Sequence, residues 1–483
     1  MKTKINLLFI ITIALILGNS CSNDLAEEAV TKADSNSART ISEKPNIIFI
    51  LADDLGYGDI SCFGQKKFQT PNIDLMATQG VKLTNYYSSG TVCAPSRCSM
   101  LTGLHTGHST VRGNSGTTLL SSDVCIASLL KNNGYTTGMY GKWGLGDPSE
   151  SGSPEKMGWD EFLGYTNHGA AHSYYVNSVK IKRKNENFTT DTAISNTICT
   201  HNLIMDYAMK FITKNKENPF FLYLPVTLPH ASMVFPTPES KAPFFLNNVS
   251  KFTETPWYNT GGSYTTQLTP NAATAAMITQ LDFEVGKIIK KLADLGLSNN
   301  TYIVFTSDNG PHKEAGRSID YFDSNGPYRG LKRDFYDGGI RVPFIAWAPG
   351  TIPANSTITK PRQGTDLFAT FLNMAGATIP SNIDSKTILP ALKSPTTAGD
   401  RSYLYWESFD SKKMQAVLKN NFKLIRTISS TGASTYELYN LVNNPGETTN
   451  VASQNPTIVN DLKAIMNSAR TNTTKYNLPN TVQ

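Results

Sequence analysis

The sequence predicts an α/β fold with a mostly parallel sheet flanked by helices, followed by a small C-terminal domain with an antiparallel sheet and a helix. Three apolar runs, Asn46–Ala52, Pro219–Pro225 and Thr301–Ser307, are continuous, as in strands buried on both faces. Between the last two runs, apolar residues spaced by three and four predict an amphipathic helix over Ala272–Leu295. Strands that alternate with helices are typical of a parallel sheet.

The C-terminal region has a different pattern. Short segments of strand-forming residues are joined by turn residues such as Asn420 and Asn421, and a helix is expected over Pro456–Met466. The segments cover residues 402–406, 416–419, 422–426 and 436–439. We therefore predict a large α/β domain over residues 45–395 and a small antiparallel domain over residues 396–483.

The first twenty residues are typical of a secretory signal. Lys2 and Lys4 precede an apolar run, Leu7–Leu17, that is too short for a permanent membrane span. Small residues before Cys21 resemble a bacterial lipoprotein signal, in which Cys21 carries the lipid; cleavage to a soluble periplasmic protein is the alternative. Residues 21–44 form a polar tether. The expected location is the periplasm, or the outer membrane and cell surface as a lipoprotein.

Charge and cysteine content narrow the function classes. The formal charge of +6, from 44 Lys and Arg against 38 Asp and Glu in 483 residues, is too small to indicate nucleic-acid binding. It is compatible with an anionic substrate or with an ordinary mixed surface. Apart from Cys21 and Cys93, the cysteines form no zinc-type pair, so disulfides and buried thiols both remain open. These are Cys62, Cys98, Cys125 and Cys199.

Polar residues follow each predicted buried strand. Asp53 and Asp54 end the first strand, His230 follows the second, and Asp308 and Asn309 end the third. In open α/β sheets, ligands bind at the carboxyl ends of the strands. Carboxylate and amide oxygens are ligands that calcium prefers. The sequence thus predicts a divalent cation site formed by these acids and the amide.

A motif around Cys93 carries the most specific signal. The segment from Cys93 through Arg97 to Gly103 resembles the signature C-x-P-S-R-x-x-x-L-T-G of type I sulfatases, in which the Cys is oxidised to formylglycine. The resemblance covers residues 45–460 and includes Gly141–Trp143 and Gly330–Lys332. It implies an alkaline-phosphatase-like fold, a bound Ca²⁺, and a formylglycine-generating enzyme as maturation partner.

The resemblance also implies a role for each matched residue. Hydrated formylglycine from Cys93 is a geminal diol: one hydroxyl attacks sulfur, and the other later helps to expel sulfate and restore the aldehyde. The modified residue also joins the metal site. Arg97 steadies this site, and Lys142 and Lys332 bind the sulfate. His230 contacts the substrate as general acid, with Lys332 close by.

One position departs from the family pattern. Sulfatases usually have His two residues after the motif lysine, whereas this chain has Gly144. In the usual enzymes that imidazole holds a hydroxyl of the nucleophile, so the regeneration of the aldehyde lacks an assigned group. Residues 167–175 resemble a stretch of bacterial glycan sulfatases with the same variant. We expect His172 at the substrate or nucleophile side of the pocket; a structural loop histidine is the alternative. Trp406 and Glu407 are weaker candidates for the pocket wall.

The expected function is a sulfuric ester hydrolase that removes sulfate from a glycan-derived saccharide, with galactose-type sugars as a weak preference. A phosphate or phosphonate monoester hydrolase shares this metal and nucleophile layout and is one alternative. The other is an inactive glycan-binding lipoprotein, for which Gly144 would be the first sign. The intact Cys93, Arg97, Lys142, His230 and Lys332 argue against lost activity.

Overall fold

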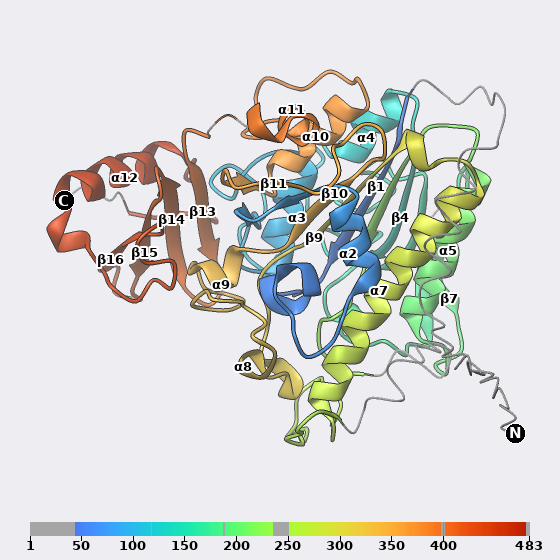
Figure 1. Ribbon diagram of the computed structural model, residues 1–483, viewed down its shortest axis with the longest axis horizontal. Helices are drawn as coiled ribbons and strands as arrows, with labels where there is room; N and C mark the ends of the chain where they lie inside the picture. Colours follow the sequence, from blue (N-terminus) through green and yellow to red (C-terminus); the bar gives the residue numbers. More distant parts are fainter. Residues whose placement is uncertain are drawn as a thin grey trace, which may run out of the picture.

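The computed structural model describes residues 44–116, 118–186, 189–234, 251–397, 399 and 401–479 (Figure 1). The predicted signal over residues 1–20, the tether up to residue 43 and the proposed lipid on Cys21 lie outside these residues. Within the described ranges, no helix is both long and apolar enough to cross a bilayer.

A ten-stranded sheet forms the centre of the molecule, in the order β11-β2-β10-β9-β1-β8-β4-β5-β6-β7. The five adjacent strands from β9 to β5 are parallel, whereas β10, β6 and β7 run antiparallel to their neighbours. The predicted mostly parallel sheet is thus confirmed at its centre. The three predicted strands are β1 (Asn46–Ala52), β8 (Phe220–Pro225) and β9 (Thr301–Ser307). The other strands of the large domain are β2 (Val81–Leu83), β3 (Tyr86–Tyr87), β4 (Thr136–Lys142), β5 (Glu161–Tyr165), β6 (Ser178–Lys182), β7 (Thr189–Ala193), β10 (Phe344–Trp347), β11 (Ser356–Ile358) and β12 (Arg362–Gln363).

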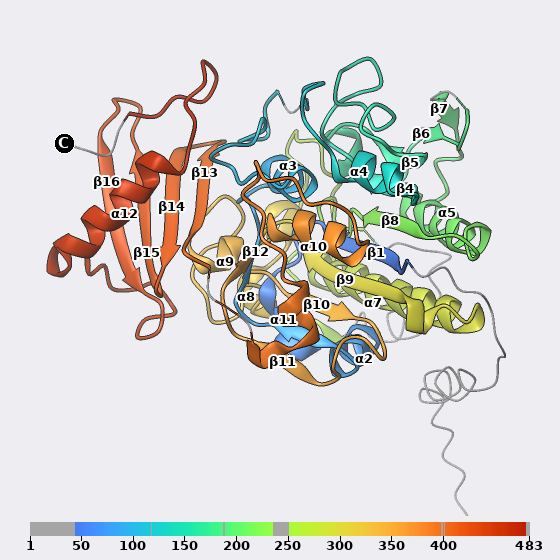
Figure 2. The ribbon, with the colours of Figure 1, turned by 90° about the horizontal axis from the view of Figure 1, so that it is seen from above.

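Helices cover both faces of this sheet (Figure 2). Along β1, which is buried throughout, Ile48 and Ile50 join one apolar core, while Ile47 and Phe49 join the other. Both faces of a central strand are therefore apolar, which explains its unbroken hydrophobic run. The first core includes α2 (Pro71–Thr78), α5 (Thr200–Lys214) and α7 (Pro270–Asp294); the second includes α3 (Cys93–Thr102), α4 (Ile126–Asn132), α10 (Asp366–Met374) and α11 (Leu389–Lys393). Helix α7 confirms the predicted amphipathic helix.

A separate four-stranded antiparallel sheet follows, in the order β13-β14-β15-β16, as predicted. One face packs on α12 (Pro456–Ser468), and the other packs on Tyr87, Phe335 and Ile340 of the large domain. Figure 1 shows this sheet beside the short helix α9 (Asp337–Ile340). Trp406 and Glu407 are buried here, and Trp406 Nε1 donates to the carbonyl of Ser88 at 2.8 Å. The strands are β13 (Leu404–Phe409), β14 (Lys413–Lys419), β15 (Phe422–Ile428) and β16 (Ser434–Asn440).

The sequence left open whether the cysteines form disulfides or buried thiols, and the described part of the chain answers this. None of the cysteines there forms a disulfide, namely Cys62, Cys93, Cys98, Cys125 and Cys199. Only Cys62 is partly exposed, and the others are buried. Burial raises the pKa of Cys98 and of Cys125 to about 12, so these two behave as small apolar side chains.

Candidate active site

The carboxyl ends of β1 and β9 bring together four of the five predicted metal ligands. The two strands are parallel neighbours, with Ala52 paired with Ser307, so the residues that follow them lie side by side. The backbone N–H of Asp54 donates to Asp308 Oδ1 at 3.1 Å, and Asn309 Nδ2 donates to Asp54 Oδ1 at 2.6 Å. The side chains of Asp53, Asp54, Asp308 and Asn309 are all fully buried.

Cys93 is the first residue of α3 and points at these acids. Its Sγ lies 3.3 Å from Asp53 Oδ1 and 3.4 Å from Lys142 Nζ. Burial, reinforced by Asp53, raises the pKa of the Cys93 thiol well above its ordinary value. The unmodified side chain therefore stays protonated at neutral pH and is a poor nucleophile.

Arg97, one turn further along α3, ties three elements together. Its Nε and Nη2 donate to Asp308 Oδ2 at 3.0 and 2.8 Å, and its Nη1 donates to the carbonyl of Lys142 at 2.7 Å. The guanidinium is fully buried. A planar, bidentate donor of this kind fixes the orientation of the Asp308 carboxylate as well as its charge.

Two buried lysines neutralise the adjacent acids. Lys142, at the end of β4, donates to Asp53 Oδ2 at 2.7 Å, and Lys332 donates to Asp54 Oδ2 at the same distance. Burial by itself would raise the pKa of Asp53, but the nearby cations, with Lys142 foremost, hold it well below its ordinary value. The two ammonium groups are thus held in place beside Cys93 with little freedom to move, as required for stabilising an oxyanion.

His230 lies in the loop after β8, next to Lys332. Its Nδ1 donates to the carbonyl of Ala231 at 2.6 Å, and its Nε2 lies 3.2 Å from Lys332 Nζ and 3.4 Å from Asp54 Oδ2. Burial and then Lys332 lower the pKa of His230 well below its usual value. The neutral Nε2 therefore accepts a hydrogen bond from the Lys332 ammonium, and this pair has one proton ready for transfer.

His172, in the short helix Ala170–His172, stacks on His230 with ring centroids 4.6 Å apart and an angle of 11°. Tyr264 lies beside it, with 5.6 Å between the ring centroids, and donates to Glu314 at 2.5 Å. His172 is only partly buried, so it lies at the mouth of the cluster on the His230 side. Its expected role in substrate binding stays a prediction.

The structure adds two histidines that the sequence reasoning did not single out. His312 follows β9 closely; its Nε2 lies 3.3 Å from the carbonyl of Pro229, and its ring lies 5.4 Å from that of His230. His168 packs against Gly144. Both lie in segments that already carried a signal, the loop after Asn309 and the His-rich stretch of residues 167–175.

The cluster fits a divalent cation. Asp53, Asp54, Cys93 and His230 can each offer a ligand atom within 4.8 Å of the others. The buried Oδ1 of Asn309 has no hydrogen-bond partner within the described ranges, an arrangement that is costly unless a ligand satisfies the oxygen. Burial and then Asp53 raise the pKa of Asp308 to about 7, so the acids repel one another. A hard cation would relieve both defects, and the oxygen ligands suit calcium.

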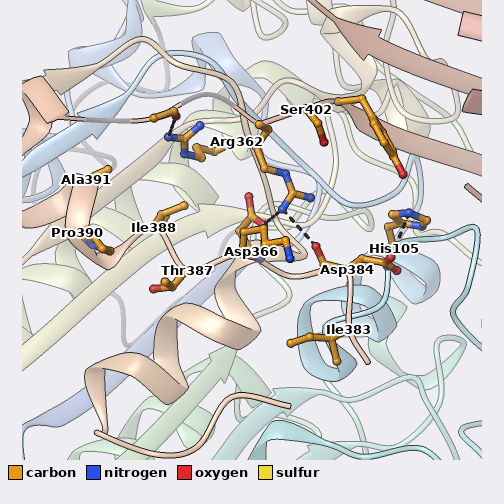
Figure 3. A pocket seen from close by; sticks show the side chains of 14 residues that line it. His105, Arg362, Asp366, Ile383, Asp384, Thr387, Ile388, Pro390, Ala391 and Ser402 are labelled. Atoms are coloured by element: carbon orange, nitrogen blue, oxygen red, sulfur yellow. Dashed lines mark hydrogen bonds and ion pairs between the residues drawn. The ribbon is translucent and has the colours of Figure 1, made fainter. Parts of the chain in front are cut away.

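A second polar cluster lies in a different cavity of about 600 Å³, shown in Figure 3. Its charged groups already pair with one another: Arg401 Nη1 lies 2.8 Å from Asp366 Oδ1, and Asp384 accepts from His108 at 3.0 Å. His105 Nδ1 accepts from the N–H of Gly107, so its protonated Nε2 faces Asp384 at 3.4 Å. With no free lone pair on His105, the cluster fits a structural role better than a metal site.

Comparisons with known proteins point to one family. A family model described as Sulfatase matches residues 45–377, and one described as N-sulphoglucosamine sulphohydrolase, C-terminal, matches residues 329–472. The N-acetylgalactosamine-6-sulfatase of Rattus norvegicus is 32% identical over 382 residues, which cover 72% of this chain and 66% of that protein. The chain thus spans about two thirds of that relative's length. The N-acetylgalactosamine-6-O-sulfatase of Bacteroides thetaiotaomicron is 28% identical over 509 residues, with 89% and 94% covered.

Solved structures show the same fold. The crystal structure of Ps i-CgsB in complex with k-i-k-neocarrahexaose superposes with a TM-score of 0.72 at 26% identity, covering 88% of this chain and 92% of that one. The expected alkaline-phosphatase-like α/β architecture with a small antiparallel C-terminal sheet is therefore confirmed. Family match, identity and fold agree, and the chain belongs to the sulfatase family.

Proposed function

We propose that this protein hydrolyses sulfate esters of a carbohydrate, with the side chain of residue 93 as nucleophile after oxidation of Cys93 to formylglycine. The observation that carries the proposal is the position of Cys93 Sγ, within 3.4 Å of both Lys142 Nζ and Asp53 Oδ1 in a fully buried cluster. A thiol with a raised pKa is a weak nucleophile there, whereas a hydrated aldehyde supplies hydroxyls at the same point.

Attack on sulfur needs a base and fixed positive charge. Asp53 Oδ1 already accepts a hydrogen bond from residue 93 and is placed to accept the proton of the attacking hydroxyl. The ammonium groups of Lys142 and Lys332 lie on either side of the acids and can bind the sulfate oxygens as negative charge shifts in the transition state. Arg97 keeps Asp308 in place without facing the substrate itself.

The sugar oxygen that leaves is a poor leaving group and needs a proton. Lys332 and His230, 3.2 Å apart, can supply it: Lys332 Nζ gives a proton to the neutral His230 Nε2, and Nε2 then passes that proton to the leaving oxygen. The bond from His230 Nδ1 to the carbonyl of Ala231 keeps the ring in the orientation that this transfer requires.

The metal site adds a further requirement. Asp53, Asp54, Asp308 and Asn309, together with residue 93, would hold a calcium ion. Such a cation, when bound, polarises the sulfate oxygens and orients the nucleophile.

We infer a saccharide of galactose type as the substrate. The relatives in rat and in Bacteroides thetaiotaomicron carry the name of sulfatases of N-acetylgalactosamine, and the similar solved structure holds a neocarrahexaose. His172 and Tyr264 form an aromatic edge beside His230, suited to contact with a sugar ring.

We also propose export and a lipid on Cys21, which labelling with radioactive palmitate would test against a Cys21→Ser control.

Mass spectrometry of the peptide that contains residue 93, from protein made in its native host, tests the nucleophile. We expect the mass of formylglycine; an unmodified thiol would contradict the proposal.

Sulfate release from a panel of sulfated mono- and disaccharides tests the substrate, with Cys93→Ala as the control. Parallel assays on sulfate and phosphate esters of one alcohol separate the two hydrolase classes, and faster phosphate release would favour the phosphatase alternative.

A further inference from the structure

The space left open by Gly144 is filled by another imidazole. A Cβ atom at Gly144 would lie 2.5 Å from Cε1 and 2.9 Å from Nε2 of His168. The backbone of Gly144 also has φ of +72°, a region that side chains rarely adopt. The backbone conformation therefore favours glycine at this position, and the ring of His168 leaves no room for a side chain there.

Two neighbouring strand ends create this arrangement. β4 and β5 are parallel, and their hydrogen bonds continue past the end of β4: the N–H of Trp143 donates to the carbonyl of Tyr165 at 2.8 Å, and that of Gly144 donates to Thr166 at 3.0 Å. His168 follows two residues after Thr166. The imidazole that related enzymes carry on the first of these segments is here supplied by the second.

The ring nitrogens of His168 are unusual. Both are buried, and neither has a hydrogen-bond partner in the described part of the chain. Burying polar nitrogens without partners is unfavourable unless a ligand or substrate group completes them. His201 on α5 also has two unpartnered nitrogens within the described residues, but it is fully buried and Lys287 is the one charge that shifts its pKa.

The surroundings of His168 place it on the nucleophile's side of the site. Burial, then Lys142 and Arg97, lower the pKa of His168 well below its usual value, so the ring is neutral at physiological pH. Lys142 is the lysine that contacts Cys93 Sγ, at 3.4 Å. His230, in contrast, contacts Lys332. Burial and then Lys142 also lower the pKa of His172, but of these two only His168 has both ring nitrogens buried without a hydrogen-bond partner within the described residues.

We propose that His168 is the base that resets the nucleophile, in place of the histidine replaced by Gly144. The proposal rests on the function proposed above. After transfer of the sulfo group to residue 93, His168 takes the proton of the remaining hydroxyl. The electron pair of that O–H bond forms the C=O bond, and the C–O bond to sulfate breaks with its electron pair on the departing sulfate. Water then hydrates the aldehyde again.

Rapid-mixing kinetics with p-nitrophenyl sulfate separate this step from the first one. For His168→Ala and for His168→Gln, we expect a burst of one p-nitrophenol per active site at the wild-type rate. The steady rate after the burst should fall by about 10²–10⁴-fold, the usual contribution of a proton-transfer group. Mass spectrometry of the quenched protein should show a sulfo group retained at residue 93, which a purely structural role would not produce.

A relocation variant provides the rescue. Gly144→His alone should unfold at a lower temperature than wild type, because its side chain meets the His168 ring. The double variant Gly144→His, His168→Gly returns the imidazole to the first segment, and histidine tolerates positive φ better than most residues. We expect the steady rate of the double variant to be at least tenfold higher than that of His168→Ala. His201→Ala controls for the loss of a buried, unpartnered imidazole and should show no burst.

The outcomes are distinct. A wild-type protein that carries an unmodified thiol or releases no sulfate would overturn the proposed function and this assignment with it. An active wild type with His168 variants that lose burst and steady rate together, or that keep both, would overturn the assignment to His168 alone. Retention of the sulfo group together with rescue by the double variant would establish it.

Discussion

Lys423 is the residue whose replacement we expect to damage the fold most clearly. It lies on β15 of the small sheet, and its Nζ contacts Asp337 Oδ1 at 2.5 Å and Glu447 Oε1 at 2.7 Å. All three side chains are fully buried. Asp337 begins α9 and also pairs with Arg341 at 3.1 Å, so Lys423 joins the small sheet to the segment that follows Lys332.

The perturbation is Lys423→Met, which keeps the length of the side chain and removes its charge. Asp337 and Glu447 then remain buried with only Arg341 to balance them. Removing one partner from a buried ion pair costs about 3–5 kcal/mol, and we expect the free energy of unfolding to fall by that amount. Burial by itself would raise the pKa of Asp337, and Lys423 now holds it below its ordinary value; burial already raises the pKa of Glu447, against the effect of Lys423.

Without Lys423 both carboxyl groups should titrate in the folded protein above their unfolded values of about 4. A carboxyl group whose pKa is higher in the folded than in the unfolded protein lowers the free energy of unfolding as pH rises. The deficit of the variant should therefore be small near pH 4 and grow toward neutral pH.

Urea unfolding followed by tryptophan fluorescence and by far-UV circular dichroism measures this deficit at each pH. Lys413→Met, an exposed lysine on the adjacent strand β14, is the matched control and should change stability by no more than about 0.5 kcal/mol. If Lys423→Met at pH 7 costs as little as Lys413→Met, or if its deficit does not depend on pH, the reasoning is refuted.

Three further predictions concern the site. His230→Ala should slow saccharide desulfation by about 10²–10⁴-fold but affect p-nitrophenyl sulfate much less, because that leaving group needs no proton; equal losses on both substrates would contradict a proton-donor role. Chelation by EDTA should abolish turnover and lower the unfolding temperature, and added calcium should restore both; full activity after dialysis against EDTA would count against a metal. Arg97→Met should cost about 3–5 kcal/mol in urea unfolding, because Asp308 loses its bidentate partner; a cost below 1 kcal/mol would show that the pair is dispensable.

Some parts of the fold could be predicted because their physics is local. β1, β8 and β9 are buried on both faces, so each needs apolar residues at successive positions and appears in the sequence as an unbroken apolar run. The second half of helix α7 has buried apolar residues at spacings of three and four, namely Leu281, Val285, Ile288 and Leu292. The small sheet has a turn marked by Asn420 and Asn421, both at positive φ. The short strands β2, β10 and β11 escaped prediction because three or four residues are too few to show a period.

The sequence by itself named the candidate residues of the site. Cys93 with Arg97, the acids after β1 and β9, and the two lysines could all be named from motifs and strand ends, because their residue types are required by the chemistry wherever they stand. The pairing of β1 with β9 could not be read in this way, since 254 residues separate Asp54 from Asp308.

Which side chains lie beside each lysine follows from the tertiary structure alone. Lys332 meets His230, which lies in the loop after β8. His168 occupies the space beside Gly144, because β4 and β5 lie next to each other and end at the same edge of the sheet. The sequence shows only that position 144 has no histidine. Whether another imidazole lies at that point in space depends on which strand is the neighbour of β4.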